Sequence, residues 1–257
     1  MKKEKTCLSV AIISYNEENN IERCLKSIID IASEIIVVDS GSNDKTTIIA
    51  KSYGANIFIE CWKGYILQKN SALSKCTKDW ILFLDADEEV TKELKSSIKG
   101  AIEEDFRDGY FINRKSFYLG KLLIHTWQPD YILRLVKKHS NPCWGGYEPH
   151  AILHVIGSTD KLKGDLIHYS YTNIKEHIER LSKYAYLTAN SYKIDGKPFH
   201  LYKLIFNPLF SFIKEFILKM GFLDGIRGFL VAILSAIYVF LKYSYLWEIN
   251  KNEKEQQ

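Results

Sequence analysis

The sequence lacks any strong excess of charge. Its 257 residues include 35 Lys and Arg against 31 Asp and Glu, a formal net charge of only +4. This balance gives no support for a nucleic-acid-binding protein, which usually concentrates basic residues on one surface. Cysteines are also few. The five are scattered without the CxxC spacing of a metal or redox site, which indicates reduced thiols in a reducing compartment.

The first residues of the chain lack the apolar stretch and the small-residue cleavage site of a secretory leader. We therefore expect the body of the protein to stay in the cytoplasm. Hydrophobic residues make up 46% of the sequence, so the chain can bury a sizeable core. The length suits one large domain, or one domain with an appendage.

Apolar, strand-like runs alternate with helical patterns up to about Glu104. Repeated strand-helix units of this length predict a parallel sheet covered by helices on both faces. Helix caps are expected at Asn19 or Asn20, at Thr91 and at Asn173. The predicted strands of this part are residues 7–13, 35–38, 56–59 and 80–84. After Asp105 we expect shorter strands at 109–114, 117–119 and 131–136, followed by a loop at 141–150.

Polar residues follow three of these strands. Asp85 and Asp87 come directly after the run 80–84, while the polar loops 14–17 and 39–44 follow the first two strands. Ligands of open α/β sheets bind beyond the carboxyl ends of the strands, so the three loops predict one site. Two carboxylates suit Mg²⁺, which is usually held by one or two of them plus substrate phosphates. Because this loop should face solvent, we expect loss of either carboxylate to lower turnover far more than stability.

Three ordered motifs resemble those of family 2 glycosyltransferases: residues 9–17 (SVAIISYNE), 36–46 (IVVDSGSNDKT) and 83–88 (FLDADE). Residues 62–65 (WKGY), 68–70 (QKN) and 168–171 (HYSY) resemble the branch that extends lipopolysaccharide core sugars. The resemblance implies an α/β protein with the GT-A (Rossmann-like) nucleotide-diphospho-sugar transferase fold. It also implies an inverting mechanism, a nucleotide-sugar donor that we expect to be UDP-linked, and a divalent cation, Mg²⁺ or Mn²⁺.

The resemblance also assigns roles to single residues. Asp39 is expected to accept hydrogen bonds from the base, and Asp87 to hold the metal against the diphosphate. A solvated helix face is the alternative for Lys69. The residues expected around the nucleotide are Ser14, Tyr15, Glu17, Asp39, Lys69, Asn70 and Asp85. The expected metal ligands are Asp87, Asp85 and His150.

Inversion requires a general base that takes the proton from the acceptor hydroxyl. Glu148 is the acidic residue of the 141–150 loop and is the predicted base, with Asp87 as the second catalytic residue. Related sequences often carry a Glu directly after the His of this loop, where this chain has Ala151. Asp130 and His150 therefore remain alternatives for the base.

His168 follows the apolar residues 166–167 and is expected to be structural, although GT-A enzymes sometimes draw a metal ligand from this region.

The C-terminal part is dense in Phe, Tyr and Trp. Pro208 is expected at a first helical position. The last helix holds about 14 uncharged residues between Arg227 and Lys242, short of the roughly 20 that a membrane span needs. A buried hairpin and a true span stay open, but we favour a segment lying in the bilayer interface. The predicted domains are therefore a GT-A domain at 1–200 and an amphipathic helical membrane-associating region at 201–257.

The function expected from these features is inverting transfer of a sugar from a nucleotide-sugar donor to a glycolipid or lipopolysaccharide-precursor acceptor. The enzyme would act at a membrane surface, on the cytoplasmic face of the bacterial inner membrane, and would not bind nucleic acid. A nucleotidyltransferase would normally show a Gly-rich basic loop after the first strand, and residues 14–17 are not one. A catalytically degenerate binding module is favoured by Ala151 and opposed by the intact Asp85 and Asp87.

Overall fold

The computed structural model describes residues 7–256, with side chains described for residues 7–251. Residues 1–6, which carried part of the argument against a leader, lie outside the described residues. The chain divides into two compact units. The first comprises the chain up to Arg114 together with residues 130–146 and 151–168, and the second comprises residues 115–129, 147–150 and the chain from Tyr169 onward. The predicted boundary at residue 200 stays a prediction.

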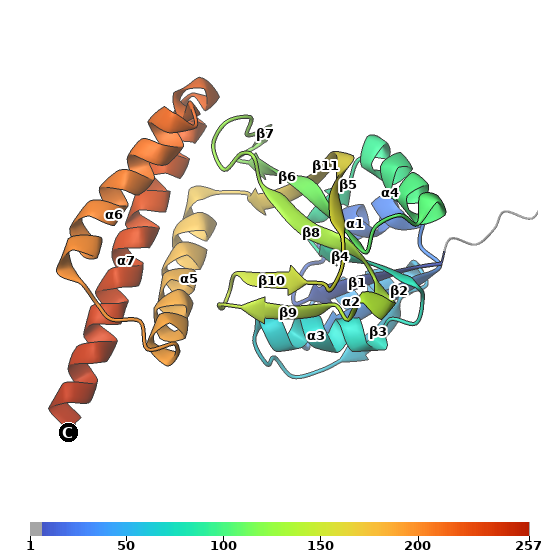
Figure 1. Ribbon diagram of the computed structural model, residues 1–257, viewed down its shortest axis with the longest axis horizontal. Coiled ribbons are helices and arrows are strands. Elements are labelled where there is room, and N and C mark those ends of the chain that lie inside the picture. The colour runs from blue at the N-terminus through green and yellow to red at the C-terminus, as the bar shows by residue number, and fades with distance from the viewer. Residues whose placement is uncertain (1–6, 257) are drawn as a thin grey trace, which may run out of the picture. The chain divides into compact units, whose positions relative to one another are not determined.

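The first unit is built on a sheet whose first half is parallel, as the sequence predicted (Figure 1). Its four parallel strands, in the order β3-β2-β1-β4, are β1 (Leu8–Ser14), β2 (Glu34–Asp39), β3 (Asn56–Ile59) and β4 (Trp80–Asp85). The helices that connect them are α1 (Ile21–Ile28), α2 (Thr46–Ser52) and α3 (Tyr65–Lys75). The α/β class is therefore confirmed.

Beyond β4 the same sheet becomes antiparallel. Its order continues β8-β6-β11-β5, and the short strand β5 follows the carboxylate pair directly. The bounds of these strands are β5 (Glu88–Val90), β6 (Gly109–Tyr118), β8 (Tyr131–Lys137) and β11 (Thr159–Tyr171), with helix α4 at Lys92–Glu104. Because β11 returns to pair with β5, it brings a late part of the chain beside the carboxylates.

Smaller elements complete this part of the chain. The predicted 141–150 loop is partly a hairpin, because β9 (Cys143–Gly146) pairs with β10 (Ala151–His154). Strand β7 (Lys121–Leu122) pairs with β6, and a short 3₁₀ turn, η1 (Lys138–Ser140), follows β8.

The core of the first unit lies on both faces of the sheet. In β4, Trp80, Leu82 and Leu84 belong to one buried cluster, whereas Ile81 and Phe83 belong to the other. Side chains alternate between faces along a strand, so a strand buried on both faces is apolar at every position. This is why the continuous apolar runs predicted the strands well.

The helix caps follow the predictions in part. The Thr91 side chain accepts a hydrogen bond from the Leu94 amide, and Asn173 accepts one from the Glu176 amide, so both cap their helices. Asn20 precedes α1 but makes no capping bond; its amide group instead donates to Glu17 at 2.8 Å. The prediction for Asn20 was wrong because its side chain serves the loop after β1.

The second unit is mainly helical. Helix α7 packs against both α5 and α6. Pro208 lies inside α6 rather than at its start, because the helix begins seven residues earlier. The elements of this unit are α5 (Ile174–Ile194), α6 (Leu201–Ile213), a π-helical turn η2 (Lys214–Leu218), a 3₁₀ turn η3 (Gly221–Asp224) and α7 (Ile226–Gln256).

An aromatic cluster lies inside the second unit. The His177 ring stacks on Tyr171 with 4.1 Å between centroids, and its Nδ1 lies 3.0 Å from the Tyr118 hydroxyl. Burial lowers the pKa of His177 to about 4. The neutral imidazole is therefore the form that this packing favours.

Candidate nucleotide and metal site

The parallel register brings the strand ends together. Ser14 at the end of β1 is paired with Asp39 at the end of β2, and Ile13 is paired with Asp85 at the end of β4. The three polar loops therefore meet at one edge of the sheet, as expected for the carboxyl ends of parallel strands.

Asp39 is fully buried and organises the loop after β2. Its Oδ1 accepts the amides of Gly41 and Ser42 at 3.0 and 2.7 Å. Its Oδ2 accepts the hydroxyls of Ser14 and Ser42 at 2.7 and 2.6 Å. Four donors thus occupy the carboxylate that the sequence assigned to the base. The contacts on Asp39 are those of a residue that shapes the loop.

A second set of bonds joins the loop after β1 to the loop after β2. Asn16 has a left-handed backbone, with φ of 54°, and its amide donates to the Ser42 hydroxyl at 2.8 Å. Its side chain accepts the Asn43 amide, and the Glu17 amide donates to the Thr46 hydroxyl. Tyr15, half exposed, lies on this edge. The two loops therefore form one rim.

Asp85 is held between two cations. Lys69 Nζ lies 2.7 Å from Asp85 Oδ1, and Arg134 Nη2 lies 2.7 Å from Asp85 Oδ2. Burial alone would raise the pKa of Asp85, but the charges of Arg134 and Lys69 outweigh it and hold the pKa well below its usual value. Asp85 is therefore a carboxylate at neutral pH, and both its oxygens face cations.

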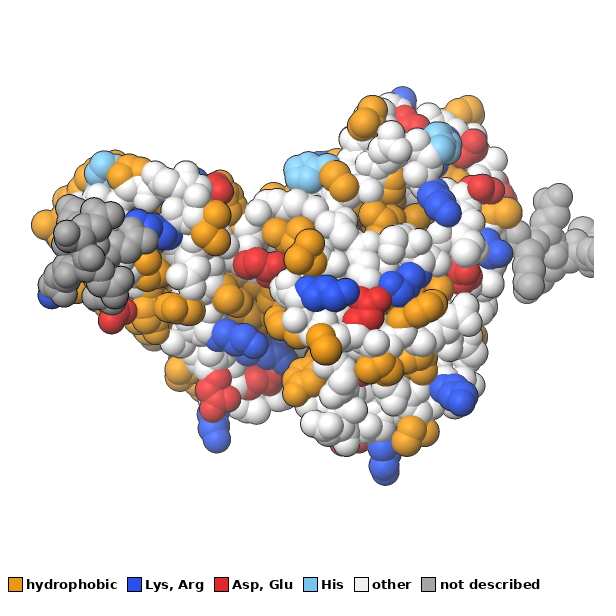
Figure 2. Space-filling model, turned by 90° about the horizontal axis from the view of Figure 1, so that it is seen from below, with side chains coloured by type: hydrophobic (Ala, Val, Ile, Leu, Met, Phe, Trp, Pro, Cys, Tyr) orange, Lys and Arg blue, Asp and Glu red, His pale blue; other side chains and the backbone are white. Residues whose placement is uncertain are grey.

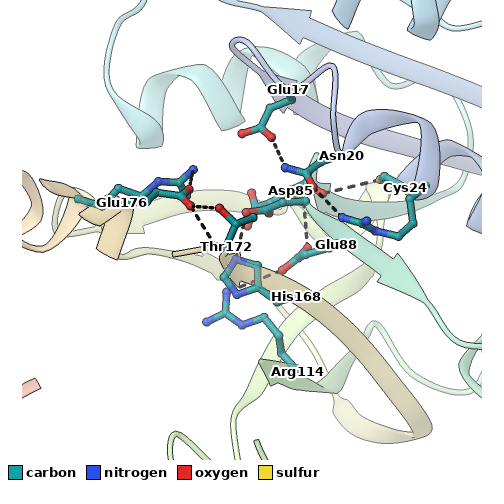
Figure 3. A network of polar contacts seen from close by, with 12 residues as sticks. Glu17, Asn20, Cys24, Asp85, Glu88, Arg114, His168, Thr172 and Glu176 are labelled. Carbon is teal, nitrogen blue, oxygen red and sulfur yellow. Dashed lines mark hydrogen bonds and ion pairs between the residues drawn. The ribbon is translucent and has the colours of Figure 1, made fainter. Parts of the chain in front are cut away.

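Glu88 contacts both Asp85 and Arg134. It is fully buried, and its Oε2 accepts the Asp85 amide at 2.9 Å while its Oε1 meets Arg134 Nη2 at 2.9 Å. Figure 3 shows Glu88 between Asp85 and Arg114, whose Nη1 lies 3.7 Å from Glu88 Oε1. Burial raises the pKa of Glu88, which Arg134 only partly offsets. Glu88 lies in the third sequence motif, but the sequence does not show that it pairs with Arg134.

Asp87 has a different partner, His168. The His168 Nε2 lies 3.3 Å from Asp87 Oδ2; His168 is partly exposed, whereas Asp87 is buried. The pairing of β11 with β5 explains the contact, because it sets His168 opposite Glu88. The contact of His168 with Asp87 depends on where the strand that carries His168 pairs in the sheet, and the sequence does not show that pairing.

These two residues fit a divalent cation. Carboxylate and neutral imidazole groups are both metal ligands, and the His168 Nε2 and Asp87 Oδ2 atoms are close enough to bind the same ion. Among residues 7–251 no group of three or more His, Cys, Asp and Glu side chains forms a complete metal site. A site with two protein ligands suits an ion whose remaining positions are filled by substrate phosphates and water.

The Asn70 side chain is hydrogen-bonded to the backbone of Trp144. Its Nδ2 donates to the Trp144 carbonyl at 2.9 Å, and its Oδ1 accepts the Trp144 amide at 2.9 Å. The side-chain amide therefore joins α3 to the β9–β10 hairpin as a neighbouring strand would. Trp144 also lies under the Lys69 ammonium, 4.6 Å from its ring centroid.

The candidates for the general base divide between the units. Asp130 belongs to the first unit, where its Oδ2 receives Arg114 Nε and Nη2 at 2.8 Å each. Glu148 and His150 belong to the second unit. There the Thr188 hydroxyl contacts the Glu148 carbonyl at 3.4 Å, and His150 Nε2 lies 3.1 Å from the Tyr238 hydroxyl.

Comparisons with known proteins agree with this geometry. The model of the family "Glycosyl transferase family 2" matches residues 9–151. An uncharacterized glycosyltransferase of Rickettsia typhi is 31% identical over 95% of this chain and 87% of its own length. The lipopolysaccharide core biosynthesis glycosyltransferase LpsC of Rhizobium meliloti is 28% identical over 95% of this chain and 93% of its own.

Among solved structures, S. aureus TarS in complex with UDP-GlcNAc matches at a TM-score of 0.50 and 16% identity, covering 97% of this chain and 92% of that chain. This likeness concerns the fold, which is GT-A as the sequence predicted. The family match spans all three strand-end loops and the carboxylate pair. The chain therefore belongs to glycosyltransferase family 2.

Proposed function

We propose that this glycosyltransferase moves a sugar, with inversion, from a nucleotide-sugar donor to a lipid-linked acceptor of lipopolysaccharide core or another surface glycan. The observation that carries the proposal is the convergence of Asp87 and His168 beside the cation-bound Asp85, at the edge where the strand-end loops meet. The resemblance to LpsC supports the acceptor class. The TarS complex with UDP-GlcNAc makes UDP the first nucleotide to test.

The donor's diphosphate would lie at this edge of the first unit. Asp87 and His168 would hold a divalent cation, Mg²⁺ or Mn²⁺, which when bound stabilises charge on the departing diphosphate. Lys69 is the cation beside them, already paired with Asp85. The rim formed by Ser14, Tyr15 and Glu17 would border the nucleoside.

The acceptor hydroxyl must lose its proton as it attacks the anomeric carbon, and Glu148 remains the proposed base. Asp130 is weakened as an alternative, because its carboxylate is held by Arg114. His150 stays the second alternative.

The lipid-linked acceptor would place the enzyme at a membrane surface, in our proposal the cytoplasmic face of the bacterial inner membrane. The apolar C-terminal helices are the feature that supports this location. One of them, Ile226–Lys251, is long and apolar enough to cross a membrane by length and composition alone.

The test is binding of UDP, GDP, CDP and TDP by calorimetry, with and without Mn²⁺. Wild type should bind one diphosphate selectively and more tightly with the metal. Asp87→Asn and His168→Gln should each weaken the metal-dependent part at least about tenfold, since each removes a ligand. Glu103→Gln, in the same unit but on α4, is the matched control and should bind as wild type.

The outcomes separate the alternatives. Metal-independent binding that neither variant alters would contradict the metal site. No binding of any diphosphate by folded protein would favour the degenerate module. Transfer itself is then tested by measuring the release of UDP from a UDP-sugar donor.

A further inference from the structure

Helix α6 exposes an apolar stripe along its length. No side chain of its 13 residues is buried. Apolar residues recur in adjacent pairs at intervals of four, which places them on one side of the helix. We call the α6 stripe the six residues that are each 51–63% exposed: Leu201, Tyr202, Ile205, Phe206, Leu209 and Phe210. Figure 2 shows hydrophobic side chains on the visible face of the molecule.

The apolar surface continues into the turns after α6. Ile213, Ile217 and Leu218 are 43–64% exposed, and Phe222 and Leu223 of η3 are about half exposed. A surface helix of a soluble protein normally turns its apolar face to the core. A contiguous exposed stripe of this length therefore requires a partner.

The charges along this segment identify the chemistry of that partner. Its two acids, Glu215 and Asp224, are turned inward: Glu215 accepts the Trp127 amide at 2.9 Å, and Asp224 accepts the amides of His125 and Thr126 at 3.0 and 2.8 Å. The remaining charges are lysines. Lys203 and Lys214 flank the stripe, whereas Lys219 is paired with Glu215 at 3.0 Å.

An apolar stripe bordered by lysines fits a bilayer of anionic lipid, where apolar side chains enter the acyl boundary and ammonium groups meet the headgroups. The dimensions of α6 exclude a span. Its 13 residues extend about 20 Å, less than the roughly 30 Å of the hydrocarbon core.

We propose that the α6 stripe is the membrane-docking face of this protein and that α6 lies in the interface of an anionic phospholipid bilayer. This inference deepens the proposed action on a lipid-linked acceptor. Helix α7 then forms the layer behind α6: Val231, Ala232 and Leu246 are fully buried within the unit. Ser182 of α5 contacts Tyr245 of α7, and Thr188 contacts Tyr238. Were α7 to cross the bilayer, this part of α5 would carry Lys183 and Lys193 into the hydrocarbon, at high cost.

The inference is tested by sedimentation of the full chain with vesicles, with no donor or metal present. Wild type should sediment with phosphatidylcholine–phosphatidylglycerol vesicles and much less with phosphatidylcholine alone. The double variant L209D/F210D, at exposed positions, should lose at least about tenfold in partition. Lys203→Glu with Lys214→Glu should lose the preference for anionic vesicles and the sensitivity to salt.

Two exposed positions in the same unit serve as matched controls: Ile178 on α5 and Phe240 on α7, which are 50% and 48% exposed. Ile178→Asp and Phe240→Asp should each sediment as wild type, and circular dichroism should report equal helix content for all variants.

If Phe240→Asp loses vesicle binding and L209D/F210D does not, the membrane contact lies on α7 and not on α6. If wild type binds no vesicles and is a dimer that L209D/F210D makes monomeric, the α6 stripe contacts a second copy of the chain instead of a membrane. Neither result would affect nucleotide binding, so the failure of this inference and that of the proposed transfer are distinguishable.

Discussion

At the scale of single residues, Asp85 and Asp87 have different surroundings although only Ala86 separates them. Asp85 is enclosed by Lys69 and Arg134, and Asp87 meets His168. The sequence suggested that both carboxylates face solvent and contribute little to stability. The contacts of Asp85 change that expectation, because removing it would take the carboxylate partner from Lys69 and leave Arg134 with Glu88 alone.

We therefore predict opposite profiles for two matched variants. Asp85→Asn should lower the free energy of unfolding by about 2 kcal/mol, less than the roughly 3–5 kcal/mol for breaking a fully buried ion pair, because 26% of the Asp85 side chain is exposed. Asp87→Asn should change stability by less than about 1 kcal/mol but lower turnover at least about a hundredfold. Urea unfolding and initial-rate assays measure the two effects. Equal destabilisation by both variants would contradict this division of roles.

At the scale of elements, the pairing of Asn70 with Trp144 fixes the β9–β10 hairpin to α3. The two hydrogen bonds run in opposite directions between the Asn70 side-chain amide and the backbone N–H and C=O of Trp144. The hairpin is also held by Phe83, whose ring meets Trp144 edge-on at 5.1 Å. Its connecting residues 147–150 include Glu148, so the hairpin anchors both ends of the loop that carries the proposed base.

We predict that Asn70→Asp loosens this hairpin and leaves UDP binding intact. The new carboxylate would face the Trp144 carbonyl, replacing a donor with an acceptor, at a cost of about 1–3 kcal/mol. The kcat should fall. The dissociation constant for UDP should stay within about threefold of the wild-type value, because the Asn70 amide is hydrogen-bonded to Trp144. Asn56→Asp, at an exposed position on β3, is the matched control. A large loss of UDP affinity would instead support the nucleotide role that the sequence assigned to Asn70.

The elements also show how far the sequence could predict this fold and site. Strands buried on both faces are apolar at every position, so β1, β2 and β4 were evident, and their polar ends located the candidate site. The antiparallel half was not evident as a sheet, because β11 pairs with β5 across more than seventy residues. Nothing local records such a pairing, which is why His168 was expected to be structural.

Local rules failed where tertiary contacts compete with them. Asn20 had the right type and place for a cap, but its amide is taken by Glu17. Pro208 was expected at a helix start and lies inside α6.

At the scale of the whole molecule, stability should respond to acid in two stages. The first involves His177, whose pKa burial lowers from 6.5 to about 4. Its neutral form is favoured by folding, so this stability is fully present above pH 6.5 and is lost as the pH falls toward 4. The second involves carboxylates such as Glu60, whose pKa the Lys75 ammonium and other partners lower from 4.5 to about 2. Their contribution is present above pH 4.5 and is lost as the pH falls toward 2.

The two stages barely overlap above pH 5, and this allows His177 to be measured in the complete chain. Between pH 7.5 and pH 5 the free energy of unfolding of wild type should fall by about 2 kcal/mol from His177. His177→Phe keeps a ring for stacking on Tyr171 but removes the titrating group and the hydrogen-bond partner of the Tyr118 hydroxyl. It should therefore begin less stable at pH 7.5 and lose much less on acidification. Urea midpoints followed by circular dichroism at both pH values give the comparison, with His139→Phe, outside this cluster, as the control. If wild type and His177→Phe lose equal stability down to pH 5, the buried neutral imidazole is not what makes the fold sensitive to mild acid.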